Sequence, residues 1–233
     1  MFFPLYLQKQ RSTLLDLDLL SHLQTYLTDR RKDTFERVLS MRTQHFTVVT
    51  EDVFQLHNTS AVMRSCEVFG VQDLSIVEEE NTKRIDKEIA MGAQKWVDLH
   101  RFNSVQNCIN SLRKDGYQIV ATSPHNESVY LHDFDVTKKS AFFFGREKDG
   151  LSDTVLKEAD VSLKIPMYGF TESLNISVSA AIVLQHVVTK LKQSTIDWKL
   201  TEEKKNELRL LWAKNTIRSI DDIIRRYYEE NPK

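Results

Sequence analysis

The 233-residue sequence has little glycine, little cysteine and almost no net charge, and each shortage excludes a class of protein. Its six glycines form neither a GxGxxG segment nor a P-loop, so the usual signals of a dinucleotide or nucleoside triphosphate site are missing. The two cysteines, Cys66 and Cys108, lack metal-site spacing, and we expect neither a bound metal nor a disulfide framework. A net charge of −1 argues against a strongly basic nucleic-acid-binding protein but is compatible with a local basic patch.

Signals for export and membrane insertion are also missing. Residues 1–10 (MFFPLYLQKQ) are briefly apolar, but they have no basic n-region and the apolar stretch is too short for a signal peptide. No hydrophobic run approaches the length of a transmembrane helix. We therefore expect a cytoplasmic protein with no membrane partner, and the low cysteine content fits that reducing compartment.

What the sequence does contain is an alternation of short apolar runs and segments with helical spacing. This alternation predicts an α/β fold with a parallel sheet and helices on both faces, in which ligands bind at the carboxyl ends of the strands. We expect Asp153 and Ser173 to be helix N-caps. The predicted strands are 46–50, 73–77, 95–99, 118–122, 141–145 and 161–165, and the predicted helices are 12–27, 29–40, 58–68, 105–114, 154–159, 173–191, 201–213 and 219–230.

Residues 161–191 form the most informative segment, with a short apolar strand, the loop PMYGFTE and a long helix. The start of this helix is small and polar, with Ser173, Asn175, Ser177 and Ser179. An ordinary core helix has little use for such residues. A helix N-terminus that offers free N–H groups and short side chains to a ligand does, so this segment is a candidate binding site.

Further polar residues stand at predicted loop-to-helix junctions: Asn58 and Arg64 after the first strand, and Glu147 after the apolar run AFFFG. Arg64 has apolar or small neighbours, and an arginine beside a buried helix face needs an anionic partner. Two interpretations remain open at this point. Arg64 and Glu147 form a purely structural ion pair, or they belong to a reactive site.

Three segments taken together resemble the motifs of the SpoU branch of the SPOUT RNA methyltransferases. They are residues 58–70 (NTSAVMRSCEVFG), 144–151 (FGREKDGL) and 165–181 (IPMYGFTESLNISVSAA). The resemblance covers about residues 47–191, and residues 91–102 (MGAQKWVDLHRF) add to it. Because predicted helices flank this region at both ends, the members that methylate a guanosine of tRNA are the most similar.

The resemblance implies a fold, a cofactor and an assembly. The C-terminal part of the sheet domain, residues 46–193, would be threaded into a deep trefoil knot, with helical extensions at 1–45 and 194–233. The chain would form a homodimer and would bind S-adenosylmethionine in the knot, largely through backbone groups. The cofactor's expected neighbours are Thr122, Gly145, Ile165 and Leu174.

The resemblance also implies a reaction, the transfer of methyl to the 2′-hydroxyl of guanosine 18 in the D-loop of tRNA. Its catalytic residues would be Arg64, Asn58, Glu147, Ser173 and Asn175. In the family, the residue at the position of Arg64 is assigned the role of proton acceptor, aided by RNA phosphate. An alternative is that Arg64 positions the phosphate and stabilises the developing oxyanion, since a guanidinium is very hard to deprotonate. Asn58 and Glu147 would orient Arg64, while Ser173 and Asn175 would shape the pocket edge.

A basic cluster near the N-terminus has two interpretations. Such charge runs are usually a solvated helix face, but the resemblance favours a contact with tRNA phosphates, whose affinity would depend on salt. The members of this cluster are Arg30, Arg31, Lys32, Arg37 and Arg42.

Other functions remain as alternatives to the methylation of tRNA guanosine 18. The same chemistry would serve ribosomal RNA or another tRNA position, although the short N-terminal extension favours tRNA. A non-catalytic RNA-binding module would keep the fold without the reaction, which the presence of Asn58, Arg64, Glu147 and Asn175 argues against. A nicotinamide-dependent enzyme is the most distant alternative, because its phosphate-binding loop is missing.

Overall fold

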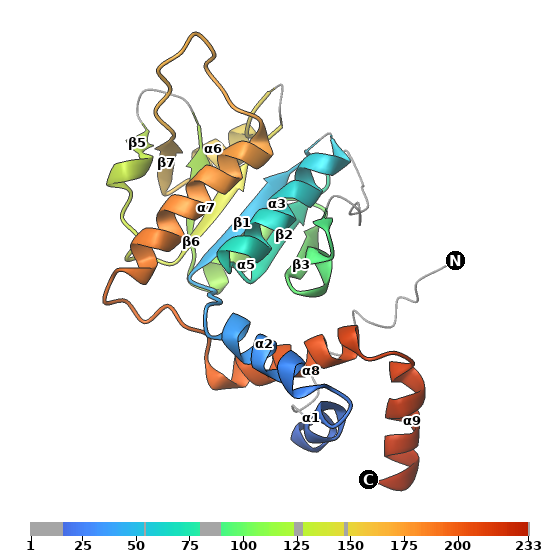
Figure 1. Cartoon of the computed structure of the whole chain (residues 1–233). Helices are drawn as coiled ribbons and strands as arrows, with labels where there is room; N and C mark the ends of the chain where they lie inside the picture. Colours follow the sequence, from blue (N-terminus) through green and yellow to red (C-terminus); the bar gives the residue numbers. More distant parts are fainter. Residues whose placement is uncertain (1–15, 54, 80–89, 124–127, 147–148, 233) are drawn as a thin grey trace. The chain divides into compact units, whose positions relative to one another are not determined.

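The computed structural model describes residues 16–53, 55–79, 90–123, 128–146 and 149–232 (Figure 1). By their contacts the residues divide into two compact units. The larger unit is Met41–Lys199, and the smaller combines Met1–Ser40 with Leu200–Lys233. The predicted domain boundaries at residues 45/46 and 193/194 stay a prediction, because contacts within one chain do not test which segments act as domains.

The larger unit is built on a seven-stranded sheet with the order β3-β2-β1-β6-β4-β7-β5. Every neighbouring pair of strands is parallel, which confirms the predicted parallel α/β architecture. In the centre, Val48 of β1 lies opposite Leu74 of β2 and Phe142 of β6. The strands are β1 (Phe46–Glu51), β2 (Asp73–Val77), β3 (Asp98–Phe102), β4 (Gln118–Thr122), β5 (Val129–Tyr130), β6 (Ser140–Phe144) and β7 (Val161–Lys164).

Helices cover both faces of this sheet, as Figure 1 shows. Phe142 of β6 belongs to one core cluster, which it shares with α3 (Leu56–Phe69) and α7 (Ile176–Lys192). Its neighbour Phe143 points the other way, into the cluster of α5 (Val105–Lys114) and α6 (Asp153–Glu158). A strand buried on both faces has to be apolar throughout, which is why AFFF was recognisable in the sequence.

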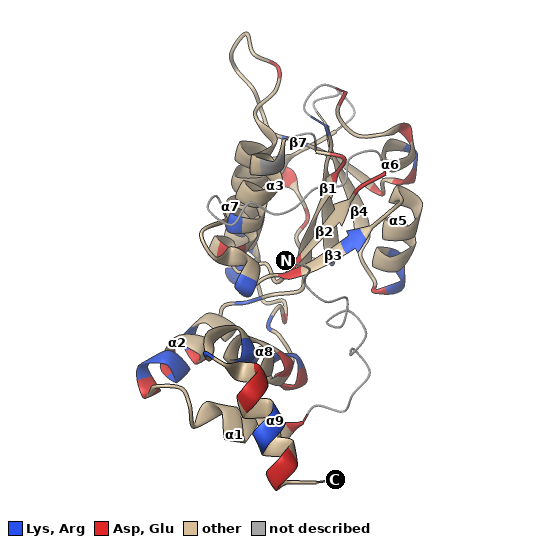
Figure 2. Cartoon of the chain, turned by 90° about the vertical axis from the view of Figure 1, so that its right-hand side faces the viewer, with Lys and Arg blue, Asp and Glu red and all other residues tan. Residues whose placement is uncertain are grey.

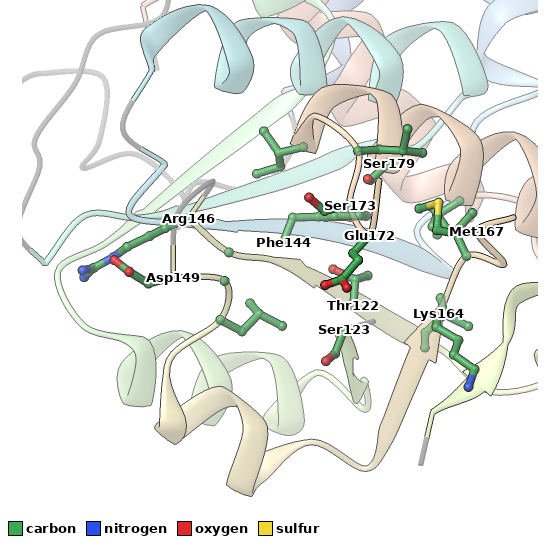
Figure 3. A pocket seen from close by; sticks show the side chains of 18 of the residues that line it. Thr122, Ser123, Phe144, Arg146, Asp149, Lys164, Met167, Glu172, Ser173 and Ser179 are labelled. Carbon is green, nitrogen blue, oxygen red and sulfur yellow. The ribbon is translucent and has the colours of Figure 1, made fainter. Parts of the chain in front are cut away.

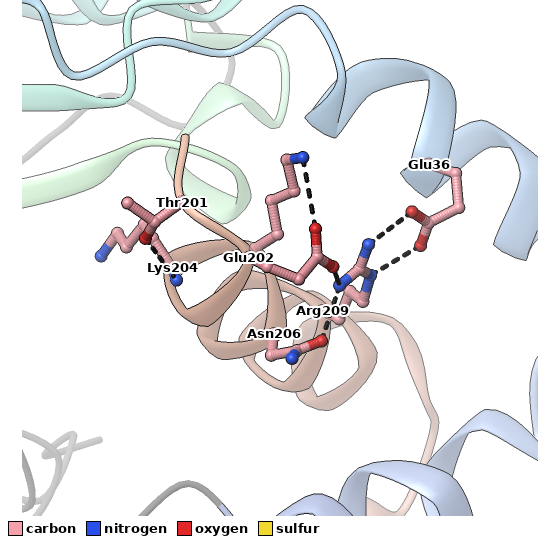
Figure 4. Close-up of polar contacts among 7 residues, drawn as sticks. Glu36, Thr201, Glu202, Lys204, Asn206 and Arg209 are labelled. Carbon is pink, nitrogen blue, oxygen red and sulfur yellow. Dashed lines mark hydrogen bonds and ion pairs between the residues drawn. The ribbon is translucent and has the colours of Figure 1, made fainter. Parts of the chain in front are cut away.

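The smaller unit contains four helices in its described part: α1 (Leu17–Gln24), α2 (Asp29–Leu39), α8 (Glu202–Thr216) and α9 (Ile220–Glu230). Phe35 and Trp212 meet edge to face in its interior, with ring centroids 5.5 Å apart. Arg209 of α8 donates two hydrogen bonds, each 2.7 Å long, to the carboxylate of Glu36 on α2 (Figure 4). This bidentate contact ties α2 to α8, and it raises the pKa of Arg209.

The structure corrects several predicted boundaries. The strand predicted at 95–99 exists but was placed three residues too early, because Ala93–Lys95 is the 3₁₀ helix η2 and β3 is Asp98–Phe102. The two-residue β5 and the following 3₁₀ helix η3 (Leu131–Asp133) are too short for a periodicity to reveal. Residues 12–15 of the first predicted helix lie outside the described residues.

Both predicted N-caps were also wrong, each by one or two residues. Ser152 caps α6, since its hydroxyl accepts a hydrogen bond from the backbone N–H of Val155. Asn175 caps α7, so this helix begins at Ile176 and Ser173 lies in the loop before it. Several consecutive residues in each segment had suitable cap chemistry, and only the backbone conformation selects one of them.

Candidate functional site

A pocket of about 350 Å³ opens at the carboxyl ends of β4, β6 and β7. The four residues predicted from sequence to neighbour a cofactor, Thr122, Gly145, Ile165 and Leu174, all line it. They come from three strand ends and from the loop before α7, so segments far apart in the chain meet here. Figure 3 shows Arg146 and Asp149 on one side of this pocket and Lys164 and Met167 on the other.

The lining of the pocket combines an apolar wall with small hydroxyl groups. The hydroxyl of Thr122 donates to the carbonyl of Phe143 at 2.7 Å, which fixes its side chain. Such a surface fits a ligand with a flat apolar ring and a polar remainder, because a few placed polar groups orient what an apolar wall holds. The apolar wall includes Leu163, Ile165, Leu174, Ile176 and Val183, and the further hydroxyls are Ser123, Ser173 and Ser179.

Gly145 occupies the tightest point of the pocket wall. A Cβ atom at this position would lie 2.3 Å from the carbonyl carbon and oxygen of Gly150. Backbone atoms cannot give way to such a contact, so only glycine fits here. Gly145 and Gly150, which both line the pocket, are therefore packed directly against each other.

Asn58 and Asn175 bring two of the three sequence motifs together. Asn58 lies in the first turns of α3 and is 2% exposed. The side-chain amide of Asn175, 117 residues later in the chain, donates a 3.1 Å hydrogen bond to the side-chain oxygen of Asn58. The oxygen of Asn175 at the same time accepts from the backbone N–H of Ser177 at 2.8 Å, which caps α7. One side chain therefore fixes the start of α7 and connects it to α3.

Arg64 lies farther along α3, and its side chain is exposed. We expected an anionic partner for it because its sequence neighbours are apolar. The structure removes that requirement, since the helix turns Arg64 to the surface while Val62, Met63 and Cys66 are buried. The proposed pairing with Glu147 stays untested, because Glu147 lies outside the described residues.

The basic cluster divides between exposed and buried positions. Arg30, Arg31 and Arg37 are exposed on α2, where the ribbon of Figure 2 is blue for basic residues, and Lys32 forms a 2.9 Å ion pair with Asp29. Arg42 is different. It follows α2, belongs to the larger unit and is 1% exposed.

The buried position of Arg42 corrects its assignment as an RNA contact. Its guanidinium donates to Glu67 at 3.2 Å and to the carbonyl of Val71 at 3.4 Å. Burial lowers the pKa of Arg42, while the charge of Glu67 acts in the opposite direction. A guanidinium buried in this way holds the fold together and is not accessible to a phosphate.

Sequence reasoning missed a group of charged residues next to the pocket. Glu51 and Asp52, at the end of β1, are each 3% exposed, and Arg146 lines the pocket. A signal was available, because both acids follow directly on a predicted strand, at the edge where ligands bind in parallel sheets.

The described residues give no sign of metal or thiolate chemistry. Within this part of the chain, no three His, Cys, Asp or Glu side chains are grouped so as to hold a metal ion. Burial raises the pKa of both Cys66 and Cys108 to about 12, so neither thiol ionises near neutral pH. The expectation that no metal is required stays a prediction.

Comparison with known proteins adds a family to this geometry. Residues 45–185 match the SpoU rRNA Methylase family. The tRNA (guanosine(18)-2'-O)-methyltransferase of Borreliella burgdorferi is 40% identical over 197 residues, which are 84% of this chain and 90% of that protein.

Solved structures agree with this match. The A. aeolicus TrmH/SpoU tRNA modifying enzyme superposes with a TM-score of 0.63 at 27% identity, over 88% of this chain and 98% of that one. An AdoMet bound rRNA methyltransferase from Sinorhizobium meliloti gives a TM-score of 0.58 at 25% identity, over 66% of this chain and 60% of that one.

Proposed function

The chain belongs to the SpoU rRNA Methylase family, and we propose that it methylates the 2′-hydroxyl of guanosine 18 in the D-loop of tRNA. The observation that carries this proposal is the hydrogen bond between Asn58 and Asn175 beside a pocket of suitable size. It joins the first and third of the three motifs on which the family resemblance rested. We choose tRNA as the substrate and guanosine 18 as the nucleotide because similar proteins are named for this reaction.

S-adenosylmethionine is the methyl donor of this reaction, and it supplies the methyl group as part of a sulfonium. Thr122, Gly145, Ile165 and Leu174 would hold it against the apolar wall of the pocket. Gly145 and Gly150 both line this pocket, and neither has a side chain that would keep a ligand away from the backbone. The residues present therefore fit the cofactor without a glycine-rich phosphate loop.

Arg64 acts on the RNA. Its guanidinium group contacts the phosphate next to the reacting ribose. From there it stabilises the negative charge that develops on the 2′-oxygen while the proton of that hydroxyl passes to solvent water. The exposure of Arg64 supports this role, because a large polynucleotide reaches only a surface residue.

The other residues carried over from the family act by positioning Arg64 and the edge of the pocket. Asn58 and Glu147 orient Arg64, and Ser173 and Asn175 shape the edge of the pocket. Asn175 has the firmest structural support, because one side chain caps α7 and bonds to Asn58. Most of the acceleration then comes from alignment of the hydroxyl, the methyl group and the leaving sulfur.

Further binding of tRNA involves α2. Arg30, Arg31, Lys32 and Arg37 present positive charge there, and phosphates are the natural partners of such a group. Arg42 does not take part, because it is buried.

The chain forms a homodimer and its C-terminal part is knotted. Val68 on α3 and Val178 and Ile182 on α7 are exposed apolar residues on two helices that pack together, and a second copy would cover them. Sedimentation of the purified chain tests the dimer, and an experimental chain trace from β4 to α7 tests the knot.

The protein works in the cytoplasm, where its tRNA substrate is found. No described helix has both the length and the apolar character needed to cross a membrane. Cell fractionation followed by immunodetection of the chain tests this location.

The test of function is transfer of labelled methyl from S-adenosylmethionine to unmodified tRNA transcripts, followed by mapping of the labelled nucleotide. Label on the ribose of guanosine 18 supports the proposal, and a transcript with 2′-deoxyguanosine at that position is the matched control. Label on ribosomal RNA alone would keep the chemistry and change the substrate. No transfer to either RNA, with S-adenosylmethionine still bound, would favour a non-catalytic RNA-binding module.

A further inference from the structure

Strand β1 ends in two consecutive acids that the catalytic scheme does not use. Glu51 is its last residue and Asp52 follows, and both are 3% exposed. Asp52 has a φ of 44°, in the left-handed region that non-glycine residues rarely adopt. Two adjacent buried carboxylates need partners, so the contacts of each one matter.

Asp52 binds the beginning of the loop that follows β6. Its side chain is 2% exposed and forms a 3.1 Å ion pair with the guanidinium of Arg146, whose side chain is 32% exposed. The other carboxylate oxygen of Asp52 accepts a 3.0 Å hydrogen bond from the backbone N–H of Glu79, after β2. Asp52 therefore connects the carboxyl ends of β1, β2 and β6.

Glu51 binds the other end of the same loop. Its carboxylate accepts a 3.0 Å hydrogen bond from the backbone N–H of Ser152, the residue that caps α6. Burial raises the pKa of Glu51, and the contact with Ser152 opposes that shift. The two acids thus hold the loop at residue 146 and at residue 152.

The described residues between these two points are paired with each other and line one wall of the pocket. Arg146 and Gly150 exchange two backbone hydrogen bonds, of 2.8 and 3.0 Å. Arg146, Asp149, Gly150 and Leu151 all line the pocket. A Cβ atom at Gly145 would lie 2.3 Å from the backbone of Gly150, so this segment packs directly against Gly145 and a shift of it would change the shape of the pocket.

We propose that Glu51 and Asp52 are positioning residues for the cofactor pocket, and that they hold Arg146 and the segment 149–152 in the position that S-adenosylmethionine requires. This inference rests on the proposed function, since it assumes that the pocket binds this cofactor. Neither acid touches the cofactor, and both act through the loop. The requirement is for a fixed position of this segment, because Arg146, Asp149, Gly150 and Leu151 form this part of the wall.

A merely structural role for the ion pair is the competing interpretation, and the chain offers a matched control. Glu78 and Arg101 form a 2.7 Å ion pair whose side chains are 10% and 33% exposed. This pair joins β3 to the end of β2, on the opposite side of β1 from the pocket. Asp52→Asn and Glu78→Gln therefore remove similar ion pairs, of which only one holds the pocket wall.

The experiment measures binding of S-adenosylmethionine by calorimetry, beside urea unfolding of each variant. We expect Asp52→Asn and Arg146→Gln each to weaken binding roughly tenfold, the size of one lost charged hydrogen bond. The double variant should lose little more than either single one, because both remove the same contact. Arg146→Lys should regain part of the affinity, and Glu78→Gln should bind as the unaltered chain does.

Glu51 allows a second comparison. Glu51→Gln keeps an oxygen that can accept from Ser152, whereas Glu51→Ala removes it. We expect weaker binding in the alanine variant only, with the two variants compared at temperatures where both are folded.

The outcomes separate the inference from the function on which it rests. If the unaltered chain fails to bind S-adenosylmethionine, the proposed cofactor is wrong. If it binds, and the Asp52 and Arg146 variants bind equally well, the positioning role is wrong. Equal losses in the Glu78 and Asp52 variants would also overturn it, because they would reflect stability alone. Should Asp52→Asn not fold, the two Glu51 variants decide, because Glu51 is not among the residues that line the pocket.

Discussion

In the sheet of the larger unit, charged and polar residues play different roles at the amino ends of the strands, called here the amino edge, and at their carboxyl ends, the carboxyl edge. At the amino edge these residues satisfy one another: Arg42 pairs with Glu67 at 3.2 Å, and Asp73 accepts from Gln44 at 2.8 Å and contacts His100 at 2.7 Å. At the carboxyl edge some polar side chains are also paired, as Asp52 is with Arg146 at 3.1 Å, but others, such as Ser173 and Ser179, line a pocket. A closed network stabilises the fold, whereas an open one is available to a ligand.

This difference means that substitutions at the two edges should have different consequences. Loss of a residue at the amino edge should lower the free energy of unfolding and leave catalysis by the folded protein intact. Loss of an exposed or pocket-lining residue at the carboxyl edge should affect binding or catalysis more than stability. The predictions below test this contrast, beginning with the largest expected effect.

The largest loss of stability is expected for Arg42→Ala. This change leaves a cavity and takes from Glu67 its buried partner, which should lower the free energy of unfolding by about 3 kcal/mol. Urea unfolding measures the loss. Arg37→Ala, which removes an exposed arginine, is the control and should change stability by less than about 0.5 kcal/mol. A loss of tRNA affinity in folded Arg42→Ala protein would contradict the purely structural role of the amino edge and would indicate that Arg42 contacts RNA.

Asn175→Ala should have a smaller effect on stability but a clear effect on methyl transfer. Removal of the N-cap of α7 should cost about 1 kcal/mol. Asn175→Asp sharpens the test, because a carboxylate still caps the helix but cannot donate to Asn58. We expect the aspartate variant to regain stability without regaining methyl transfer in single-turnover assays. Recovery of both stability and methyl transfer would mean that Asn175 acts only as the N-cap of α7.

The pH dependence of stability should show the burial of Glu51. An acid whose pKa is raised by folding binds its proton more tightly in the folded state. It therefore stabilises the fold below its ordinary value of 4.5, and this contribution is lost as the pH rises through the raised pKa. Urea unfolding over this range should show that loss in the unaltered chain relative to Glu51→Gln, which cannot titrate. Parallel curves for the two proteins would contradict the assignment.

The smallest effect concerns the exposed arginines of α2. Arg31→Gln should leave stability within about 0.5 kcal/mol and should lower the dependence of log Kd for tRNA on log salt by about 1, the amount for one phosphate contact. Arg225, 66% exposed on α9, supplies the control, because Arg225→Gln should leave the salt dependence unchanged. Equal slopes for both variants and the unaltered chain would mean that the basic residues of α2 form a solvated surface and do not contact tRNA.

Much of the fold was predictable because it depends on local patterns. The apolar run AFFF predicted β6, a strand with a helix cluster on each face, and Gly70 predicted the end of α3, where its φ is 80°. The pocket residues Thr122 and Gly145 were predicted through the family motifs. These signals are short-range, so the sequence displays them directly.

The features that sequence reasoning missed depend on contacts between distant segments. Arg42 stands only five residues after Arg37, yet one is buried against Glu67 and the other is exposed. Nothing in the charge pattern distinguishes them. The choice of Asn175 over Ser173 as N-cap and the pairing of Asp52 with Arg146, 94 residues apart, likewise depend on tertiary structure.

The most direct test of the account is the single-turnover rate of methyl transfer by Arg64→Ala at saturating tRNA and S-adenosylmethionine, with urea unfolding measured in parallel. Because Arg64 is exposed and is proposed to stabilise the developing charge, we expect the rate to fall by roughly 10²–10³-fold. The free energy of unfolding should stay within about 0.5 kcal/mol of the unaltered chain. A rate equal to that of the unaltered chain, or a rate loss matched by a loss of stability, would contradict the account.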